Sequence, residues 1–129
     1  MNLRVTLAAL LVCACLSFAG AARADALLTS GALPISATTI PRCVAINISK
    51  VPISSMNVTL VNTPGSPPST LTAVCSNVPP DGLCVSGGGE ATLGNVFCRI
   101  TAHASPKSIR GTMMTVLGSG DVNATTEAR

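Results

Sequence analysis

Apolar and polar residues alternate most regularly between residues 96 and 103. One set of alternate positions is apolar: Val96, Cys98, Ile100 and Ala102. The other set is mainly polar: Phe97, Arg99, Thr101 and His103. This pattern predicts a strand with one buried and one solvated face.

A second alternating run covers residues 109–117 and places Ile109, Gly111, Met113, Thr115 and Leu117 on one side. A turn-like break containing Pro106 separates it from the first run, and two runs this close predict a β-hairpin. The adjacent Met113 and Met114 are expected to point to opposite faces.

Further strands are predicted at residues 43–48, 56–62 and 70–75, with a possible edge strand at 26–29. The inward residues of the second of these are Met56, Val58 and Leu60. In the first, the bulky side chains Val44, Ile46 and Ile48 are expected to face the core, which places Cys43 on the opposite face. A bulge near residues 41–42, or a disulfide at the strand end, would reconcile that conflict.

Short, regularly spaced strands separated by Gly- and Pro-containing turns predict an all-β fold. We expect a small immunoglobulin-like or fibronectin-like antiparallel β-sandwich. No helical periodicity of useful length follows the first two dozen residues. The segment 118–129 is expected to be either an edge strand around Val122 or a loose tail.

Residues 1–24 have the form of a secretory signal peptide. A basic start at Arg4 precedes an apolar run over residues 5–16, and Ala22-Arg23-Ala24 fits a cleavage site before Asp25. The apolar run is shorter than the ~20 residues of a membrane-spanning helix. Cleavage leaves residues 25–129 as a single domain without an integral membrane segment. Lipidation of Cys15 is the alternative, because residues 12–15 loosely resemble a lipoprotein box.

The charge balance argues against nucleic acid as a partner. Two of the eight basic residues lie in the leader, so the excess of basic over acidic side chains falls from three to one. Such a near-neutral surface has no electrostatic footprint for nucleic acid or anionic membrane. Phe97 is the one aromatic residue after the leader, which leaves no stacking platform.

Four cysteines remain after the leader: Cys43, Cys75, Cys84 and Cys98. An even number in a short exported domain predicts two disulfides, with three possible connectivities. Cys75 and Cys84 bracket a loop with a Pro-Asp-Gly turn, so we pair them and pair Cys43 with Cys98. The spacing lacks a C-x-x-C pair and there is a single histidine, so we expect no metal and no cofactor. The disulfides place the protein in the periplasm or outside the cell.

The layout resembles small exported bacterial β-domains of the immunoglobulin-like sandwich type that have no assigned activity. The similarity covers the segments at residues 43–49, 58–61, 78–82, 97–101 and 109–112. It implies a fold and an exported location, and it supplies no catalytic residues.

His103 is the one candidate general base. Ser105 and Ser108 are close in sequence, and three carboxylates could approach in space to complete a triad: Asp81, Glu90 and Asp121. No nucleophile-elbow motif is present, and the alternation places His103 on the solvated face of its strand. We therefore expect a protein that is not an enzyme.

The loop between Cys75 and Cys84 is the candidate binding site. Its candidate residues are Asn77, Pro79, Pro80, Asp81, Gly82 and Leu83. A loop that is closed by a disulfide and stiffened by prolines loses less conformational entropy on docking. A disulfide that only stabilises the turn would give the same sequence.

We expect a non-enzymatic exported domain that binds another protein or contributes to the cell envelope. Its strand edges could accept a strand from that partner. The alternative is a protease inhibitor that acts through the Cys75–Cys84 loop.

Overall fold

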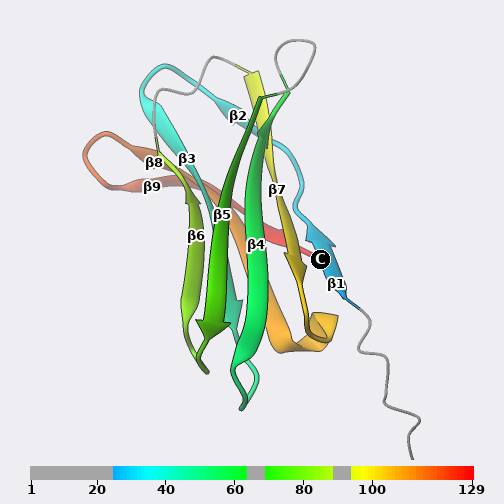
Figure 1. Ribbon diagram of the computed structural model, residues 1–129. Helices are drawn as coiled ribbons and strands as arrows, with labels where there is room; N and C mark the ends of the chain where they lie inside the picture. Colours follow the sequence, from blue (N-terminus) through cyan, green and yellow to red (C-terminus); the bar gives the residue numbers. More distant parts are fainter. Residues whose placement is uncertain (1–24, 64–68, 89–93) are drawn as a thin grey trace, which may run out of the picture.

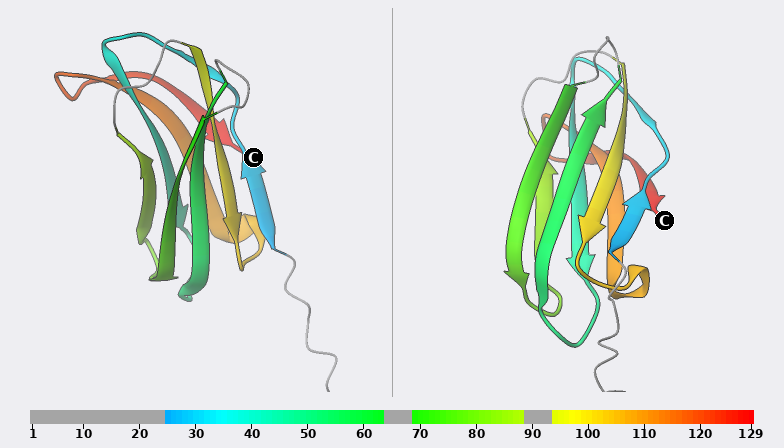
Figure 2. Two further views of the ribbon diagram at one scale, coloured as in Figure 1. Left: turned by 45° about the horizontal axis from the view of Figure 1, so that its top comes forward. Right: turned by 45° about the vertical axis from the view of Figure 1, so that its right-hand side comes forward.

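The computed structural model describes residues 25–63, 69–88 and 94–129, which form two antiparallel β-sheets (Figure 1). The strands are β1 (Ala26–Thr29), β2 (Leu33–Ile35), β3 (Thr39–Asn47), β4 (Ile53–Asn62), β5 (Ser69–Val78), β6 (Leu83–Gly87), β7 (Gly94–Ala102), β8 (Ile109–Leu117) and β9 (Val122–Ala128), and a short 3-10 helix, η2, covers Pro106–Ser108. The first sheet has the order β1-β7-β4-β5, and β2 also pairs with β7; the second has the order β6-β3-β8-β9. The two sheets form separate layers (Figure 2). This arrangement confirms the predicted antiparallel β-sandwich.

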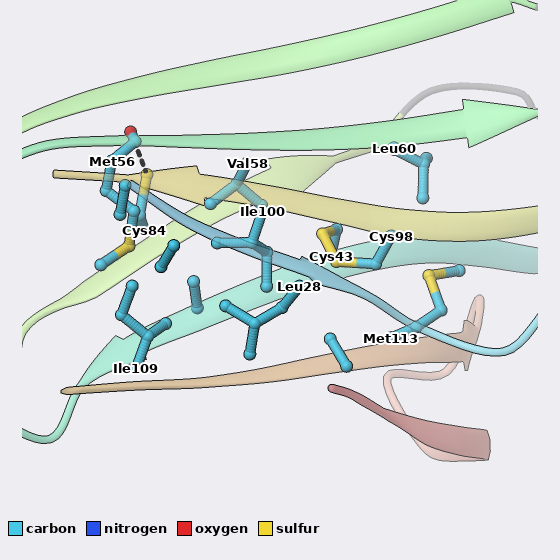
Figure 3. Packing of buried hydrophobic residues seen from close by; sticks show 14 of the residues in the cluster. Leu28, Cys43, Met56, Val58, Leu60, Cys84, Cys98, Ile100, Ile109 and Met113 are labelled. Carbon is cyan, nitrogen blue, oxygen red and sulfur yellow. Dashed lines mark hydrogen bonds between the residues drawn. A yellow bond between two sulfur atoms is a disulfide. The ribbon is translucent and has the colours of Figure 1, made fainter. Parts of the chain in front are cut away.

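Both predicted disulfides are present. Cys43 of β3 bonds to Cys98 of β7, with 5.4 Å between their Cα atoms, and both residues are fully buried (Figure 3). Cys75 of β5 bonds to Cys84 of β6, with a Cα–Cα distance of 5.9 Å. The first bridge therefore joins an inner strand of each sheet across the core, and the second joins two edge strands.

The buried faces of β7 and β8 are as predicted, but the predicted hairpin between them is wrong. β7 pairs with β1, β2 and β4 in the first sheet, whereas β8 pairs with β3 and β9 in the second. Residues 103–108 carry the chain from one sheet to the other through η2, whose first turn is capped when the Ser105 hydroxyl accepts a hydrogen bond from the Lys107 N–H. This connection is too long for a tight two-residue turn, so the two buried faces can lie opposite each other in the core.

The predicted inward face of β3 is wrong. Cys43, Ala45 and Asn47 are fully buried, whereas Val44 and Ile46 lie on the outer face. β3 pairs with β8 without a register shift along its whole length, so no bulge reverses the strand near residue 41. A disulfide across the core requires the cysteine side chain to point inward. Because side chains alternate with a period of two, that requirement sets the orientation of every other residue of β3.

The two sheets are also joined along both sides of the sandwich. On one side the Thr29 N–H donates to the carbonyl of Arg129 at 3.0 Å, and Ser30 forms a β-bridge with Ala128. The C-terminus accordingly lies beside β1 (Figure 1). The segment 118–129 thus contains a paired strand, β9, which was one of the two expectations. On the other side the Ser86 hydroxyl of β6 donates to the Leu71 carbonyl of β5 at 2.6 Å, and the Cys75–Cys84 bridge joins the same two strands.

Gly111 allows the two sheets to approach closely near β8. A methyl group at this position would collide with Ile100 of β7 and would lie 2.8 Å from the Cβ of Ala128. We expect Gly111→Ala to lower the free energy of unfolding by about 1–3 kcal/mol, as overpacked cores do. Denaturant unfolding measures this change.

Gly118→Ala is the matched control, because nothing lies within 4 Å of a methyl group placed there. It should change the free energy of unfolding by less than about 0.5 kcal/mol. Equal effects of the two substitutions would contradict the proposed packing of β8 against β7.

Candidate functional site

Apolar side chains cover much of the outer face of the second sheet. The strand registers place them on neighbouring strands, with Val44 opposite Val85, Ile46 opposite Leu83, and Val116 between Ile40 and Val122. We call this surface the apolar face, and its members are Ile40, Val44, Ile46, Leu83, Val85, Met114, Val116 and Val122. Several are strongly exposed, with Leu83 and Val122 both at 59% and Val85 at 40%.

Two exposed arginines lie on the same surface. Arg42 is opposite Met114 near the middle of the sheet, and Arg110 is opposite Ile46 at one end. Glu127, opposite Thr112, is the one carboxylate on the outward rows of this sheet that the structure describes. The outer surface that contains the apolar face therefore has a net positive charge.

The outer face of the first sheet is different. Hydroxyl and amide side chains occupy most of its outward positions, including Asn57, Thr59, Thr72 and Thr101. The hydroxyls of Thr59 and Thr72 hydrogen-bond across β4 and β5 at 2.9 Å. The two strongly exposed apolar side chains on this face, Leu27 and Val74, each lie opposite a polar residue, Thr101 and Asn57. The surface of this sheet is therefore mainly polar, as is usual for an antiparallel sandwich, whereas the apolar face has apolar side chains opposite each other.

The sequence contained a signal for the apolar face that our interpretation of β3 missed. Val44 and Ile46 were assigned to the core because they are bulky and apolar. Cys43 has the opposite parity, so a cross-core disulfide at Cys43 necessarily places both of them on the outer surface.

The predicted binding loop is an exposed turn between β5 and β6. The Gly82 N–H donates to the Pro79 carbonyl at 2.9 Å, which closes a β-turn over Pro79–Gly82. Asp81 has φ of 60°, which suits the third residue of a type II turn. Asn77 and Leu83 belong to the adjoining strands rather than to the turn itself.

Asn47 fixes this turn to the connection between β3 and β4. Its side chain is fully buried, and its Nδ2 group donates to the carbonyls of Val51 at 2.8 Å and Val78 at 2.9 Å. Its backbone N–H donates to the Gly82 carbonyl at 3.0 Å, and its carbonyl accepts from the Asp81 N–H at 2.8 Å. The turn is therefore held by hydrogen bonds from the end of β3 as well as by the Cys75–Cys84 bridge.

His103 pairs with Asp25. Its Nδ1 atom lies 2.6 Å from the Asp25 carboxylate, and the two side chains are 63% and 65% exposed. The partners expected for a triad lie elsewhere: Asp81 is in the β5–β6 turn, and Asp121 accepts a hydrogen bond from Ser119 between β8 and β9. Glu90 lies outside the described residues.

Two hollows flank His103. One of about 320 Å³ lies between residues 49–53 and residues 103–108. The other, of about 160 Å³, is lined by Asp25, Ser55, Asn57 and Thr101 together with His103. Ser105 and Ser108 line the first hollow together with His103, and the Ser105 hydroxyl accepts a hydrogen bond from the Lys107 N–H at 3.3 Å.

Comparisons with known protein families, with curated proteins and with solved structures found no match to this chain. Within residues 25–63, 69–88 and 94–129, no three His, Cys, Asp or Glu side chains cluster so that they could hold a metal ion. The same residues contain no helix that is both long and apolar enough to cross a membrane.

Replacing Asn47 should destabilise the protein and loosen the β5–β6 turn. In Asn47→Ala, the Val51 and Val78 carbonyls lose their donor and Ser49 loses the acceptor of its 2.9 Å backbone hydrogen bond. We expect a loss of about 2–4 kcal/mol in the free energy of unfolding. Hydrogen exchange at the Asp81 amide should also become faster.

Asn95→Ala serves as the control, since Asn95 is exposed on β7. It should leave both the unfolding free energy and the exchange rate of Asp81 nearly unchanged. Unchanged exchange at Asp81 in Asn47→Ala would show that the disulfide and the backbone hydrogen bonds of residue 47 hold the turn without the Asn47 side chain.

Proposed function

We propose that this protein is an exported, non-enzymatic binding domain that docks another protein on its apolar face. The location of the apolar side chains is the observation that supports this proposal most directly. Contiguous exposed apolar surface is costly in water and marks interaction sites in soluble domains. The outer face of the first sheet, which is rich in threonine, provides the contrast within the same molecule.

The charges on the apolar face favour an acidic partner. Arg42 and Arg110 are both exposed there, and opposite charge on a partner would guide docking and set its orientation. Face-to-face docking of two copies would bring the Arg42 side chains near each other, because Arg42 lies close to the middle of the sheet. That juxtaposition of like charges is unfavourable, so we propose a different protein with an apolar patch flanked by carboxylates.

Export is supported by the leader-like residues 1–24 and by the two disulfides. Disulfides persist in oxidising compartments such as the periplasm and the cell exterior. The exposure of His103 and its pairing with Asp25 are consistent with a protein that is not an enzyme.

Docking on the face accounts for the structure better than strand addition at an edge. β9 is tied to β1 through the Thr29 and Ser30 contacts, and β5 is joined to β6 through the disulfide and the Ser86 hydrogen bond. These contacts cover parts of the edges at which another strand would pair.

A protease inhibitor that acts through the β5–β6 turn is the second candidate function. The Asn47 hydrogen bonds and the Cys75–Cys84 bridge hold the turn from both sides, and Pro79, Pro80 and Asp81 are exposed. Such preorganisation reduces the entropic cost of docking. Inhibition of a protease that is lost on Pro80→Gly and kept when the apolar face is altered would favour this alternative.

Photo-crosslinking in the producing cells tests the proposed function. A photoreactive phenylalanine derivative is placed at position 85 on the apolar face, or at position 74 on the outer face of the first sheet. Val85 and Val74 are both exposed strand valines, at 40% and 69%, so the control position is the more accessible of the two. We expect a discrete crosslinked product of higher mass from position 85 and none from position 74.

Charge reversal at Arg42 provides a second measurement on the same protein. Arg42→Glu should reduce the yield of the position-85 product at least about tenfold, because an acidic partner would then meet a like charge. Equal crosslinking from positions 85 and 74, or no product from either, would contradict docking on the apolar face.

A further inference from the structure

Asp25 and His103 form a cross-strand pair at the end of the first sheet. β1 pairs with β7 so that Ala26 lies opposite Ala102, and Asp25 directly precedes β1 as His103 directly follows β7. The Asp25 carboxylate and the His103 Nδ1 atom are 2.6 Å apart on the outer face. The His103 backbone N–H donates to the Ser55 carbonyl of β4 at 3.1 Å, which fixes the position of the histidine from its other side.

Asp25 is also the residue that the predicted leader cleavage would place at the N-terminus. We propose that removal of residues 1–24 completes a copper(II) site, formed by the α-amino nitrogen and the carboxylate of Asp25 with the imidazole of His103. This inference rests on the proposed export, because cleavage supplies the third donor. The third donor is the amino group of the chain, so the site needs only two side chains. It therefore differs from a metal site that is built from three or more His, Cys, Asp or Glu side chains.

The Asp25 carboxylate and the His103 imidazole already lie close enough together to share an ion. Ligands held about 2.0 Å from a metal lie roughly 3 Å from one another, close to the present separation of the carboxylate and the imidazole. The amine and the carboxylate belong to one residue and can close a six-membered chelate ring. The hollow of about 160 Å³ beside them is lined by Ser55, Asn57 and Thr101, so it offers room for the ion and for water molecules as further ligands.

The donor set selects the class of metal. Two nitrogen donors and one carboxylate oxygen suit Cu²⁺, which binds nitrogen and oxygen sites more tightly than the other divalent first-row ions. Zn²⁺ accepts the same donors, but it follows Cu²⁺ in affinity for a given site. Because the pair is exposed, an ion can reach it without opening the sandwich.

The test uses the protein recovered from its producing cells, and its intact mass is measured first. A chain that starts at Asp25 is then titrated with Cu²⁺ in competition with a chelator, and electron paramagnetic resonance reports the nitrogen ligands. We expect one tightly bound Cu²⁺ with coupling to two nitrogen atoms. In His103→Gln, the affinity should fall more than about tenfold and one nitrogen coupling should disappear.

Two matched variants separate the site from general copper binding. Adding Gly-Ser before Asp25 moves the amino group away and should weaken binding as His103→Gln does. Asp121→Asn, which removes an exposed carboxylate between β8 and β9, should leave the affinity unchanged. His103→Gln and the added Gly-Ser affect only exposed positions, so loss of folding is not expected to obscure the result.

The outcomes distinguish this site from the proposed export. A recovered chain that still carries residues before Asp25 overturns the proposed processing and the copper site with it. A chain that starts at Asp25 but binds Cu²⁺ no better than His103→Gln overturns the copper site and leaves the proposed export standing.

Discussion

The disulfide between Cys43 and Cys98 is the constraint on which the rest of the structure depends. It joins β3 and β7, inner strands of the two sheets, across a core whose described buried side chains include no aromatic ring. By loop entropy, a bridge spanning 55 residues contributes about 4 kcal/mol, against about 2.5 kcal/mol for the 9-residue span of Cys75–Cys84. Its larger consequence is geometric, because it determines which side of β3 faces the core.

Two features of the molecule follow from that choice. With Cys43 inside, Asn47 also points inward, and from there it holds the β3–β4 connection and the β5–β6 turn together. Val44 and Ile46 then point outward and form one side of the apolar face with Leu83 and Val85. The buried position of Asn47 and the exposed position of Val44 and Ile46 thus both follow from the Cys43–Cys98 disulfide.

Local alternation was sufficient to predict the strands and buried faces of β7 and β8, because each strand has one solvated side. It did not show that the chain crosses between sheets at residues 103–108, since strand pairing depends on distant segments. β3 was misoriented because side-chain size was given more weight than the parity of Cys43. The contact between Asp25 and His103 was not predicted, because it depends on the long-range pairing of β1 with β7.

The neighbouring methionines of β8 offer the most direct measurement. Met113 is fully buried, whereas Met114 is half-buried on the apolar face. Oxidation of methionine follows its accessibility, and mass spectrometry can measure the rate at each residue. In the purified protein Met114 should be oxidised faster than Met113, and in producing cells a bound partner should slow Met114 selectively. Faster oxidation of Met113, or an unchanged rate for Met114 in cells, would contradict an outward apolar face that is covered by a partner.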